Sequence, residues 1–215
     1  MPYGPALDAQ RAHHQAVLGA RDAGGELGRI LLVEHDPVIT ITPRPAAASH
    51  LLASPELLAR HGVEVHPTDR GGDITYHGPG QAVVYPIIDL KRTGIRVIEF
   101  VRLLEQAVID AIAAHGLEGR RDPDATGVWV ESRAGREAKI AAIGVRVRKW
   151  VTMHGLALNV RPNLDHFGLI VPCGLVGRAV TSMHAELGDT CPTMEDAADR
   201  VGGALRRLLI AQARG

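Results

Sequence analysis

Residues 139–160 read KIAAIGVRVRKWVTMHGLALNV and contain two long apolar stretches, 140–147 and 151–160. Arg148 and Lys149 separate the stretches, so we predict two antiparallel strands joined by a tight hairpin turn. A third strand is expected over 127–130. Because the paired strands run in opposite directions, Lys139 and Val160 should lie near one end of the hairpin, close to the loop 161–175.

The segments on either side of this hairpin alternate between short apolar strands and amphipathic helices. The helix over 97–115 has its apolar residues on one face and a terminating Gly116. Ser54 and Thr193 are expected N-caps, and Pro86 suggests an edge strand or a bulge. The expected helices are 5–23, 54–62, 97–115 and 194–213, and the further strands are 29–33, 38–41, 63–66 and 82–90, with mostly loop over 161–192. This order predicts an α+β fold in one domain spanning 1–215.

The composition excludes several classes of protein. The 215 residues carry 24 Lys+Arg and 24 Asp+Glu, so no cationic surplus is available for a nucleic-acid partner. Two cysteines cannot form a disulfide scaffold, and no Cys/His spacing resembles a zinc site, so no metal is expected. The N-terminal residues lack the apolar run of a signal peptide, and no stretch approaches the length of a membrane span. We therefore expect a cytoplasmic protein without a membrane partner.

The segment 70–81, RGGDITYHGPGQ, has four glycines and a proline in twelve residues. This composition argues against a regular strand or helix and favours a rigid loop whose backbone can approach a ligand closely. Tyr76 and His77, between the glycine clusters, would face that ligand. The alternative is a pair of β-turns with an exposed histidine. The segment matches neither the phosphate-binding loop of nucleotide hydrolases nor the dinucleotide-binding fingerprint.

Lysine is scarce in this chain, which makes the position of each lysine informative. Lys91, Lys139 and Lys149 are the only lysines among the 24 cationic residues. Lys139 begins the apolar strand KIAAIG, where it could simply extend its ammonium group to solvent. An arginine would serve that purpose equally well. Lysine, unlike arginine, can exchange a proton near neutral pH.

Cys173 lies in an irregular loop, VPCG (171–174), where its thiol would be accessible. A buried, inert cysteine is the alternative, and Cys191 is interpreted in that structural sense. A free thiol has a pKa of about 8.5 and is mostly protonated at neutral pH. A nearby ammonium group stabilises the thiolate, and the neutral amine can later accept a proton. Cys173 and Lys139 therefore form a candidate pair of nucleophile and base.

Taken in order and spacing, RGGDITYHGPGQ, KIAAIG with HGLALNV, and the PCG loop resemble the lipoyl(octanoyl) transferases, over about 31–180. The resemblance implies a fold like that of the lipoate/biotin protein ligase catalytic domain, an α+β fold that has a mixed β-sheet with packed helices. It implies transfer of an octanoyl group from octanoyl-acyl carrier protein to a specific lysine. The implied acceptors are the lipoyl domains of 2-oxoacid dehydrogenases and glycine-cleavage H protein. The reaction needs neither ATP nor a cofactor, and we expect a monomer.

The resemblance also implies roles for individual residues. Cys173 would carry the acyl thioester, and Lys139 would be its general acid and base. The implied substrate-binding residues form three short segments of the chain, within which the individual roles of His77 and His154 stay open. They are Arg70, Gly71, Gly72, Asp73, Ile74, Thr75, Tyr76, His77, Ala142, Ile143, Gly144, His154, Gly155, Leu156 and Ala157. Thr42-Pro43-Arg44 stands where the family commonly has Gly-Arg, which leaves the contact made by that loop open.

Three alternative functions remain at the level of sequence. An ATP-dependent ligase would share the fold and form an acyl-adenylate. A thiol hydrolase would pair Cys173 with His154 or His77 and release free fatty acid. A non-catalytic module would bind the acyl group reversibly. Arg146, Arg148 and Lys149 are candidates for a patch that receives an acidic carrier protein, with a solvated turn as the alternative.

Overall fold

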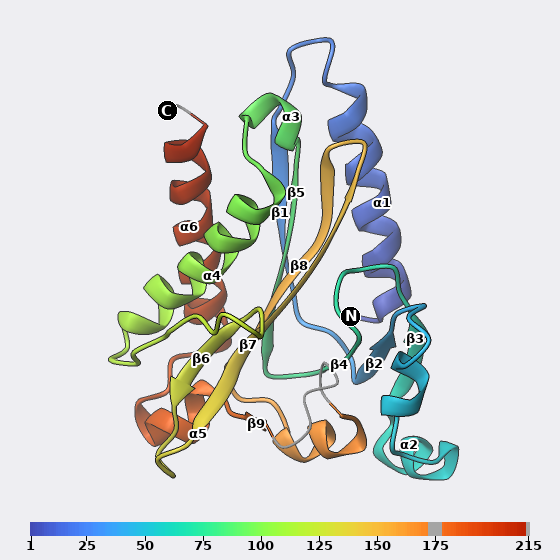
Figure 1. Cartoon of the computed structure of the whole chain (residues 1–215), viewed down its shortest axis with the longest axis vertical. Helices are drawn as coiled ribbons and strands as arrows, with labels where there is room; N and C mark the ends of the chain where they lie inside the picture. Colours follow the sequence, from blue (N-terminus) through green and yellow to red (C-terminus); the bar gives the residue numbers. More distant parts are fainter. Residues whose placement is uncertain (172–177, 214–215) are drawn as a thin grey trace.

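The computed structural model describes residues 1–171 and 178–213 of the chain (Figure 1). Within this part, the main sheet has six strands. Five of them follow the order β1 (Gly28–Val33), β5 (Gln81–Ile88), β8 (Val151–Asn159), β7 (Glu137–Arg148) and β6 (Val128–Glu131), each antiparallel to its neighbour. The sixth, β9 (Ala179–Val180), runs parallel to β7. The predicted α+β class with a mixed sheet is confirmed.

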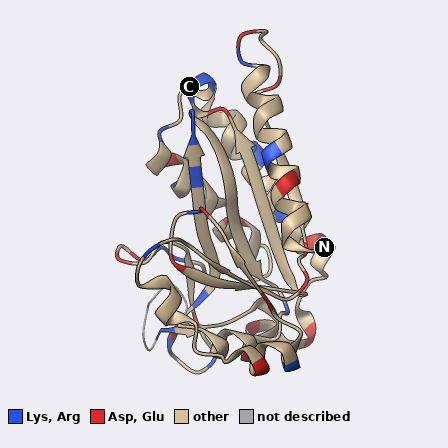
Figure 2. Ribbon diagram, turned by 90° about the vertical axis from the view of Figure 1, so that its right-hand side faces the viewer, with Lys and Arg blue, Asp and Glu red and all other residues tan. Residues whose placement is uncertain are grey.

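Helices cover both faces of this sheet (Figure 1). On one face, α4 (Val97–Ala113) and α6 (Met194–Gln212) pack on side chains such as Val84 and Leu156. On the other face lies α1 (Tyr3–Gly19), whose Val17 packs against Ile87 and Val151. Asp8 and Arg11 of α1 are exposed, and Figure 2 shows charged positions along this helix. Every residue of β5 and β8 is buried because each strand is covered on both faces.

The β7–β8 hairpin confirms the predicted pair of strands but moves the turn by one residue. Lys149 and Trp150 both have positive φ, at 51° and 65°, as a two-residue hairpin turn requires. Neither residue is a glycine or asparagine, so tertiary contacts must support this conformation. Arg21 donates to the Lys149 carbonyl at 2.8 Å, and the His14 ring contacts the Arg148 carbonyl at 3.1 Å.

A second, smaller sheet lies beside the main sheet, near the start of β5 (Figure 1). Among the described residues it contains β3 (Glu64–Pro67), β2 (Val38–Ile41) and β4 (Ile74–His77), in that order. The helical segments η1 (Ala47–His50), α2 (Pro55–His61) and η2 (Leu164–Leu169) surround it. Apolar side chains of α2 and η2 pack with Ile39, Ile74 and Tyr76 in a separate core. β1 and β2, although close in sequence, therefore belong to different sheets.

The caps at two helices confirm the predicted starts. The Ser54 hydroxyl accepts from the Leu57 amide, and the Thr193 hydroxyl accepts from the Asp196 amide. By contrast, α1 ends at Gly19, before the expected boundary. The predicted edge position of Pro86 is wrong, because β5 lies between β1 and β8. The continuous pairing between β5 and β8 ends at Val84, two residues before Pro86.

The remaining short elements are α3 (Leu90–Thr93), α5 (Met183–Leu187) and η4 (Gly188–Thr190). The expectation of mostly loop over 161–192 therefore overlooked η2, β9 and α5. In residues 1–171 and 178–213, no helix has both the length and the apolar character to cross a bilayer.

Candidate active site

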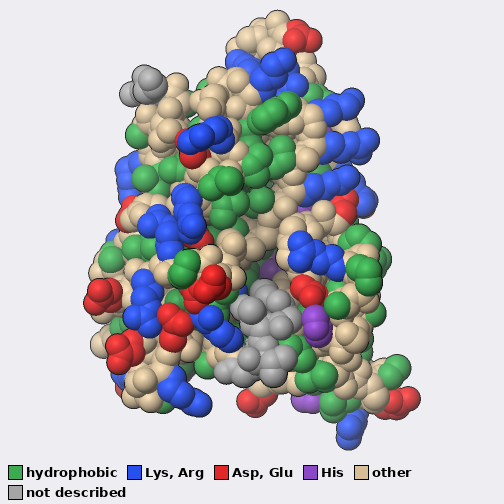
Figure 3. All heavy atoms as spheres, viewed as in Figure 1, with side chains coloured by type: hydrophobic (Ala, Val, Ile, Leu, Met, Phe, Trp, Pro, Cys, Tyr) green, Lys and Arg blue, Asp and Glu red, His purple; other side chains and the backbone are tan. Residues whose placement is uncertain are grey.

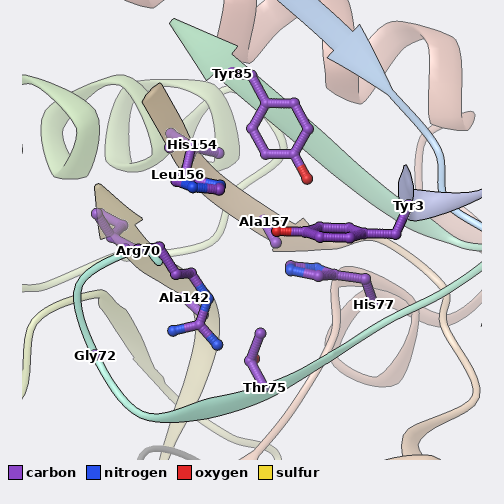
Figure 4. Close-up of a pocket in the computed structure, with 13 residues that line it drawn as sticks. Tyr3, Arg70, Gly72, Thr75, His77, Tyr85, Ala142, His154, Leu156 and Ala157 are labelled. Carbon is purple, nitrogen blue, oxygen red and sulfur yellow. The ribbon is translucent and has the colours of Figure 1, made fainter. Parts of the chain in front are cut away.

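A pocket opens between the β7–β8 hairpin and the glycine-rich segment (Figure 4). The empty space between its walls is about 460 Å³, including the solvent at its open mouth. Its walls come from β4, β5, β7, β8, the 70–72 loop and the start of α1. The lining residues are Tyr3, Arg70, Gly72, Thr75, His77, Tyr85, Ala142, Ile143, Gly144, His154, Gly155, Leu156 and Ala157.

The structure corrects the view of residues 70–81 as a loop throughout, because Ile74–His77 form strand β4. Side chains alternate across a strand, so only Thr75 and His77 line the pocket. Ile74 and Tyr76 point into the core of the smaller sheet. The Tyr76 hydroxyl lies 2.8 Å from His166 Nδ1, and burial raises the pKa of Tyr76 to about 12. Tyr76 therefore stabilises β4 from the side of the strand that faces away from the pocket.

The preceding loop is fixed against β7 and β2 by hydrogen bonds. The Gly71 amide donates to the Val145 carbonyl at 2.8 Å, and Arg70 donates to the Thr40 hydroxyl at 3.0 Å. A Cβ at Gly144 would lie 2.6 Å from the Gly71 oxygen, so only glycine permits this approach. The Asp73 carboxylate contacts His50 Nδ1 at 2.9 Å and does not line the pocket.

Small residues on paired strands form the floor. Ala142 pairs with Ala157, and Gly144 pairs with Gly155. A Cβ at Gly155 would overlap the Val84 carbonyl, so this glycine lets β8 approach β5. Such a slot, with few polar groups at its floor, suits an aliphatic chain.

Lys139 lies at one end of this floor, on the side where β7 meets β9. It is 7% exposed, and its Nζ donates to the Thr126 carbonyl at 3.0 Å. The ammonium group stands 4.7 Å from the centroid of the Trp129 ring, a favourable cation–π position. Lys139 lines a second hollow next to the pocket, and the two hollows share Gly72, Ile143 and Gly144.

Residue 173, the predicted nucleophile, lies outside the described residues. The chain re-enters the described part just before β9, where Val180 pairs with Lys139. The Thr181 amide donates to the Lys139 carbonyl at 3.0 Å. The strand that follows the Cys173 segment in sequence is thus hydrogen-bonded to Lys139. Cys191, interpreted as structural, is partly buried and packs against the main core.

Arg44 lines the second hollow together with Lys139. Thr42, in the same departure from the family pattern, donates a hydrogen bond from its hydroxyl to the Gly72 carbonyl at 3.2 Å. Its amide also donates to the Asp73 carbonyl at 3.2 Å. Thr42 therefore supports the glycine-rich loop, while Arg44 reaches the hollow.

A cluster of aromatic rings and imidazoles surrounds the pocket beside β5 (Figure 4). His35 Nε2 lies 2.7 Å from the Tyr85 hydroxyl, and the Tyr3 hydroxyl lies 2.8 Å from that of Thr68. His77 Nδ1 lies 3.0 Å from Gln81 Oε1. Burial lowers the pKa of His35 to about 4 and that of His77, which also faces His35, to about 3. Both imidazoles are therefore neutral at physiological pH.

His154 closes the pocket on the side of β8 and has an unusual backbone. Its φ is +58°, a left-handed conformation that non-glycine residues rarely adopt. Its amide donates to Gln10 Oε1 at 2.7 Å, and its Nε2 lies 3.0 Å from the Asp69 carboxylate. Burial lowers the pKa of His154, although Asp69 opposes that shift. The positive φ turns the imidazole into the pocket.

Two lining residues, Tyr3 and Tyr85, were missed by sequence reasoning. Tyr85 lies in an apolar run in which it looks like any core residue, and Tyr3 starts a helix far away in sequence. A tyrosine within a buried strand, whose hydroxyl needs a partner, was the available signal.

Comparison with known proteins identifies the family of this chain. The family profile for the lipoyl protein ligase A/B catalytic domain matches residues 7–206. An octanoyltransferase of Chloroflexus aurantiacus is 48% identical over 201 residues, covering 93% of this chain and 86% of the relative. One of Bacteroides fragilis is 42% identical over 213 residues, covering 99% and 96%.

The chain belongs to the octanoyltransferases of the lipoyl protein ligase A/B family. The resemblance drawn from the three motifs is confirmed, and so is the assignment to the acyltransferases.

Solved structures of the family share the fold at low sequence identity. A bipartite lipoate protein ligase of Thermoplasma acidophilum superposes with a TM-score of 0.67 at 16% identity, covering 88% of this chain and 79% of that one. A lipoate-protein ligase A bound with ATP superposes with a TM-score of 0.68 at 14% identity, covering 94% and 86%. At this identity the likeness supports the fold alone.

Proposed function

We propose that this chain transfers an octanoyl group from octanoyl-acyl carrier protein to a lysine of a lipoyl domain or of glycine-cleavage H protein. A covalent thioester on Cys173 is the proposed intermediate. The observation that carries the proposal is the position of Lys139. This buried lysine lines a hollow that shares Gly72, Ile143 and Gly144 with the slot suited to an aliphatic chain.

The proposed reaction has two acyl transfers. In the first, the Cys173 thiolate attacks the carrier thioester, the bond to the carrier sulfur breaks, and the released thiolate takes a proton from Lys139. In the second, the amine of the acceptor lysine attacks the new thioester, the C–N bond forms, and the Cys173 thiolate leaves. The proton lost from that amine passes to Lys139. No phosphate chemistry is needed, because a thioester already activates the acyl group.

The substrate-binding roles are part of this proposal. The residues of β7 and β8 at 142–144 and 155–157, with Thr75 and His77, would contact the acyl chain. Gly71 and Asp73 would act by holding the loop, and Ile74 and Tyr76 by supporting β4 from behind. This division follows from which side chains line the pocket.

A hydrolase that pairs Cys173 with His154 is disfavoured by the distance between His154 and Lys139. His154 pairs with Val145 on β7, six residues from Lys139, or about 20 Å at the rise of a β-strand. A thiol close to Lys139 would therefore be too far from His154 for direct proton transfer. The histidine would instead border the remote end of the acyl chain.

The hairpin patch is a poor candidate for carrier docking on similar grounds. Arg148 and Lys149 are exposed, and Figure 3 shows several basic side chains on the face of the molecule that it displays. Arg148 is nine residues along β7 from Lys139, or about 30 Å. Arg146 is already paired with Asp69. We propose that the carrier binds nearer the second hollow, where Arg44 is exposed.

The test uses octanoyl-acyl carrier protein without ATP, followed by intact-mass analysis. We expect an octanoyl adduct on the wild type that disappears in Cys173→Ser and transfers to a lipoyl domain added later. Lys139→Ala should nearly abolish turnover, and Lys139→Arg should not restore it, because arginine does not release its proton. Transfer that requires free octanoate and ATP would contradict the proposal and indicate a ligase. Robust activity of Lys139→Arg would remove the proton-transfer role.

A further inference from the structure

The pocket has a defined direction relative to Lys139. From Lys139, β7 runs past Ala142 and on to Gly144, about 10 Å and 16 Å away at the rise of a strand. The antiparallel register places Ala157 beside Ala142 and Gly155 beside Gly144. The hollow that Lys139 lines joins the pocket on the β7 side, at Gly72, Ile143 and Gly144, and none of the residues that the structure describes in β5 lines that hollow, so the β5 side of the pocket is the part farther from it.

Aromatic rings close this β5 side of the pocket. Val83 of β5 pairs with Ala157 of β8, which pairs in turn with Ala142 of β7, so Tyr85 lies across β8 from the strand that carries Lys139. Tyr85 and Tyr3 both line the pocket, and His154 stands 6.4 Å from the Tyr85 ring in an edge-to-face arrangement. In Figure 4 the Tyr3 and Tyr85 side chains converge on the same side of the pocket, opposite Ala142 and Thr75.

These rings are held rigidly. Tyr85 and Tyr3 are 3% and 2% exposed, and each hydroxyl has a buried partner, His35 Nε2 for Tyr85 and the Thr68 hydroxyl for Tyr3. Rotating either ring out of the pocket would break its hydrogen bond inside the protein, where no water can replace it. A chain that reaches the rings cannot push them aside at low cost.

We propose that Tyr85, supported by Tyr3, forms the end wall of the acyl slot and thereby determines the length of the acyl chain that is transferred. The inference rests on the proposed function, since it takes the reacting carbonyl to lie at the Lys139 end. A chain longer than the slot would have to overpack against the Tyr85 ring or withdraw its carbonyl from the reacting groups. A shorter chain would leave part of the slot unfilled and lose about fourfold in binding per missing methylene.

The experiment measures transfer from hexanoyl, octanoyl, decanoyl and dodecanoyl carrier thioesters to a lipoyl domain. The compared quantity is the ratio of kcat/KM for decanoyl to that for octanoyl within each protein, so a general loss of stability cancels. Tyr85→Ala and Tyr85→Leu should raise this ratio about tenfold or more, because two methylenes gain space in the enlarged slot. Tyr85→Phe is the matched control, since it keeps the ring and should keep the wild-type ratio.

The outcomes separate the two levels of the proposal. If the wild type transfers octanoyl groups but Tyr85→Ala and Tyr85→Leu both keep its ratio, the end wall lies elsewhere and this inference is overturned. A raised ratio in Tyr85→Phe as well would show that the hydroxyl, not the ring, sets the length. Failure of the wild type to transfer octanoyl from any thioester would overturn the proposed function, and the wall with it.

Discussion

Gly155 offers a direct test of how β8 is held against β5. A Cβ at this position would overlap the Val84 carbonyl and lie 2.6 Å from Pro86 Cδ. Both neighbours are rigid, one a backbone oxygen and the other a proline ring, so Gly155→Ala must push the two strands apart. Overpacking of this kind costs about 2–3 kcal/mol. For a chain of this length that lowers the Tm by about 4–12 °C.

The measurement is thermal unfolding followed by circular dichroism, with urea titration to give the free energy of unfolding. Gly203→Ala is the matched control, because this glycine lies inside α6 and a Cβ there would meet only the end of the Arg207 side chain, at 3.6 Å. We expect the control to gain about 0.5–1 kcal/mol, since alanine favours helix. A Gly155→Ala protein that melts within about 1 °C of the wild type would refute the close approach of β5 and β8.

Three other contacts give further testable expectations. Gly144→Ala should displace the Gly71 carbonyl, because its oxygen would lie 2.6 Å from the added methyl carbon. Octanoyl transfer should fall at least tenfold, whereas the Tm should change less than it does in Gly155→Ala. Activity and Tm are measured on the same preparation. Tyr76→Phe removes the hydroxyl bonded to His166 and should cost about 1 kcal/mol of stability while leaving the decanoyl-to-octanoyl ratio unchanged, because its ring points away from the pocket. The third concerns acid: burial lowers the pKa of His35 to about 4, so between pH 6.5 and 4 the unfolded chain binds a proton that the folded chain does not. Stability should therefore fall as the pH drops through this range, by about 3 kcal/mol from His35 alone, and urea titrations of His35→Gln should show a shallower decline.

The sequence was sufficient where structure is determined locally. The apolar runs on either side of Arg148 predicted the β7–β8 hairpin, and the hydroxyls of Ser54 and Thr193 marked two helix starts. These signals depend on residues only a few positions apart. The turn itself shifted to Lys149 and Trp150 because Arg21, from the segment after α1, holds the Lys149 carbonyl.

The glycine-rich segment shows where sequence reasoning failed. Glycines around Ile74–His77 suggested a loop, whereas β2 pairs with these four residues and makes them a strand. Pairing with a distant strand leaves no mark on the segment itself. Once the strand is known, alternation separates Thr75 and His77, which line the pocket, from Tyr76, which does not.

The sequence by itself determined the family, the hairpin and the choice of Lys139 as a residue to examine, because motifs and periodicity are local properties of the chain. Only the tertiary structure decided how the pocket is closed. Tyr3 and Tyr85 are both far in sequence from Lys139 and Gly155. They meet at one slot because α1 packs across the sheet and β5 pairs with β8, and such contacts depend on the packing of whole elements.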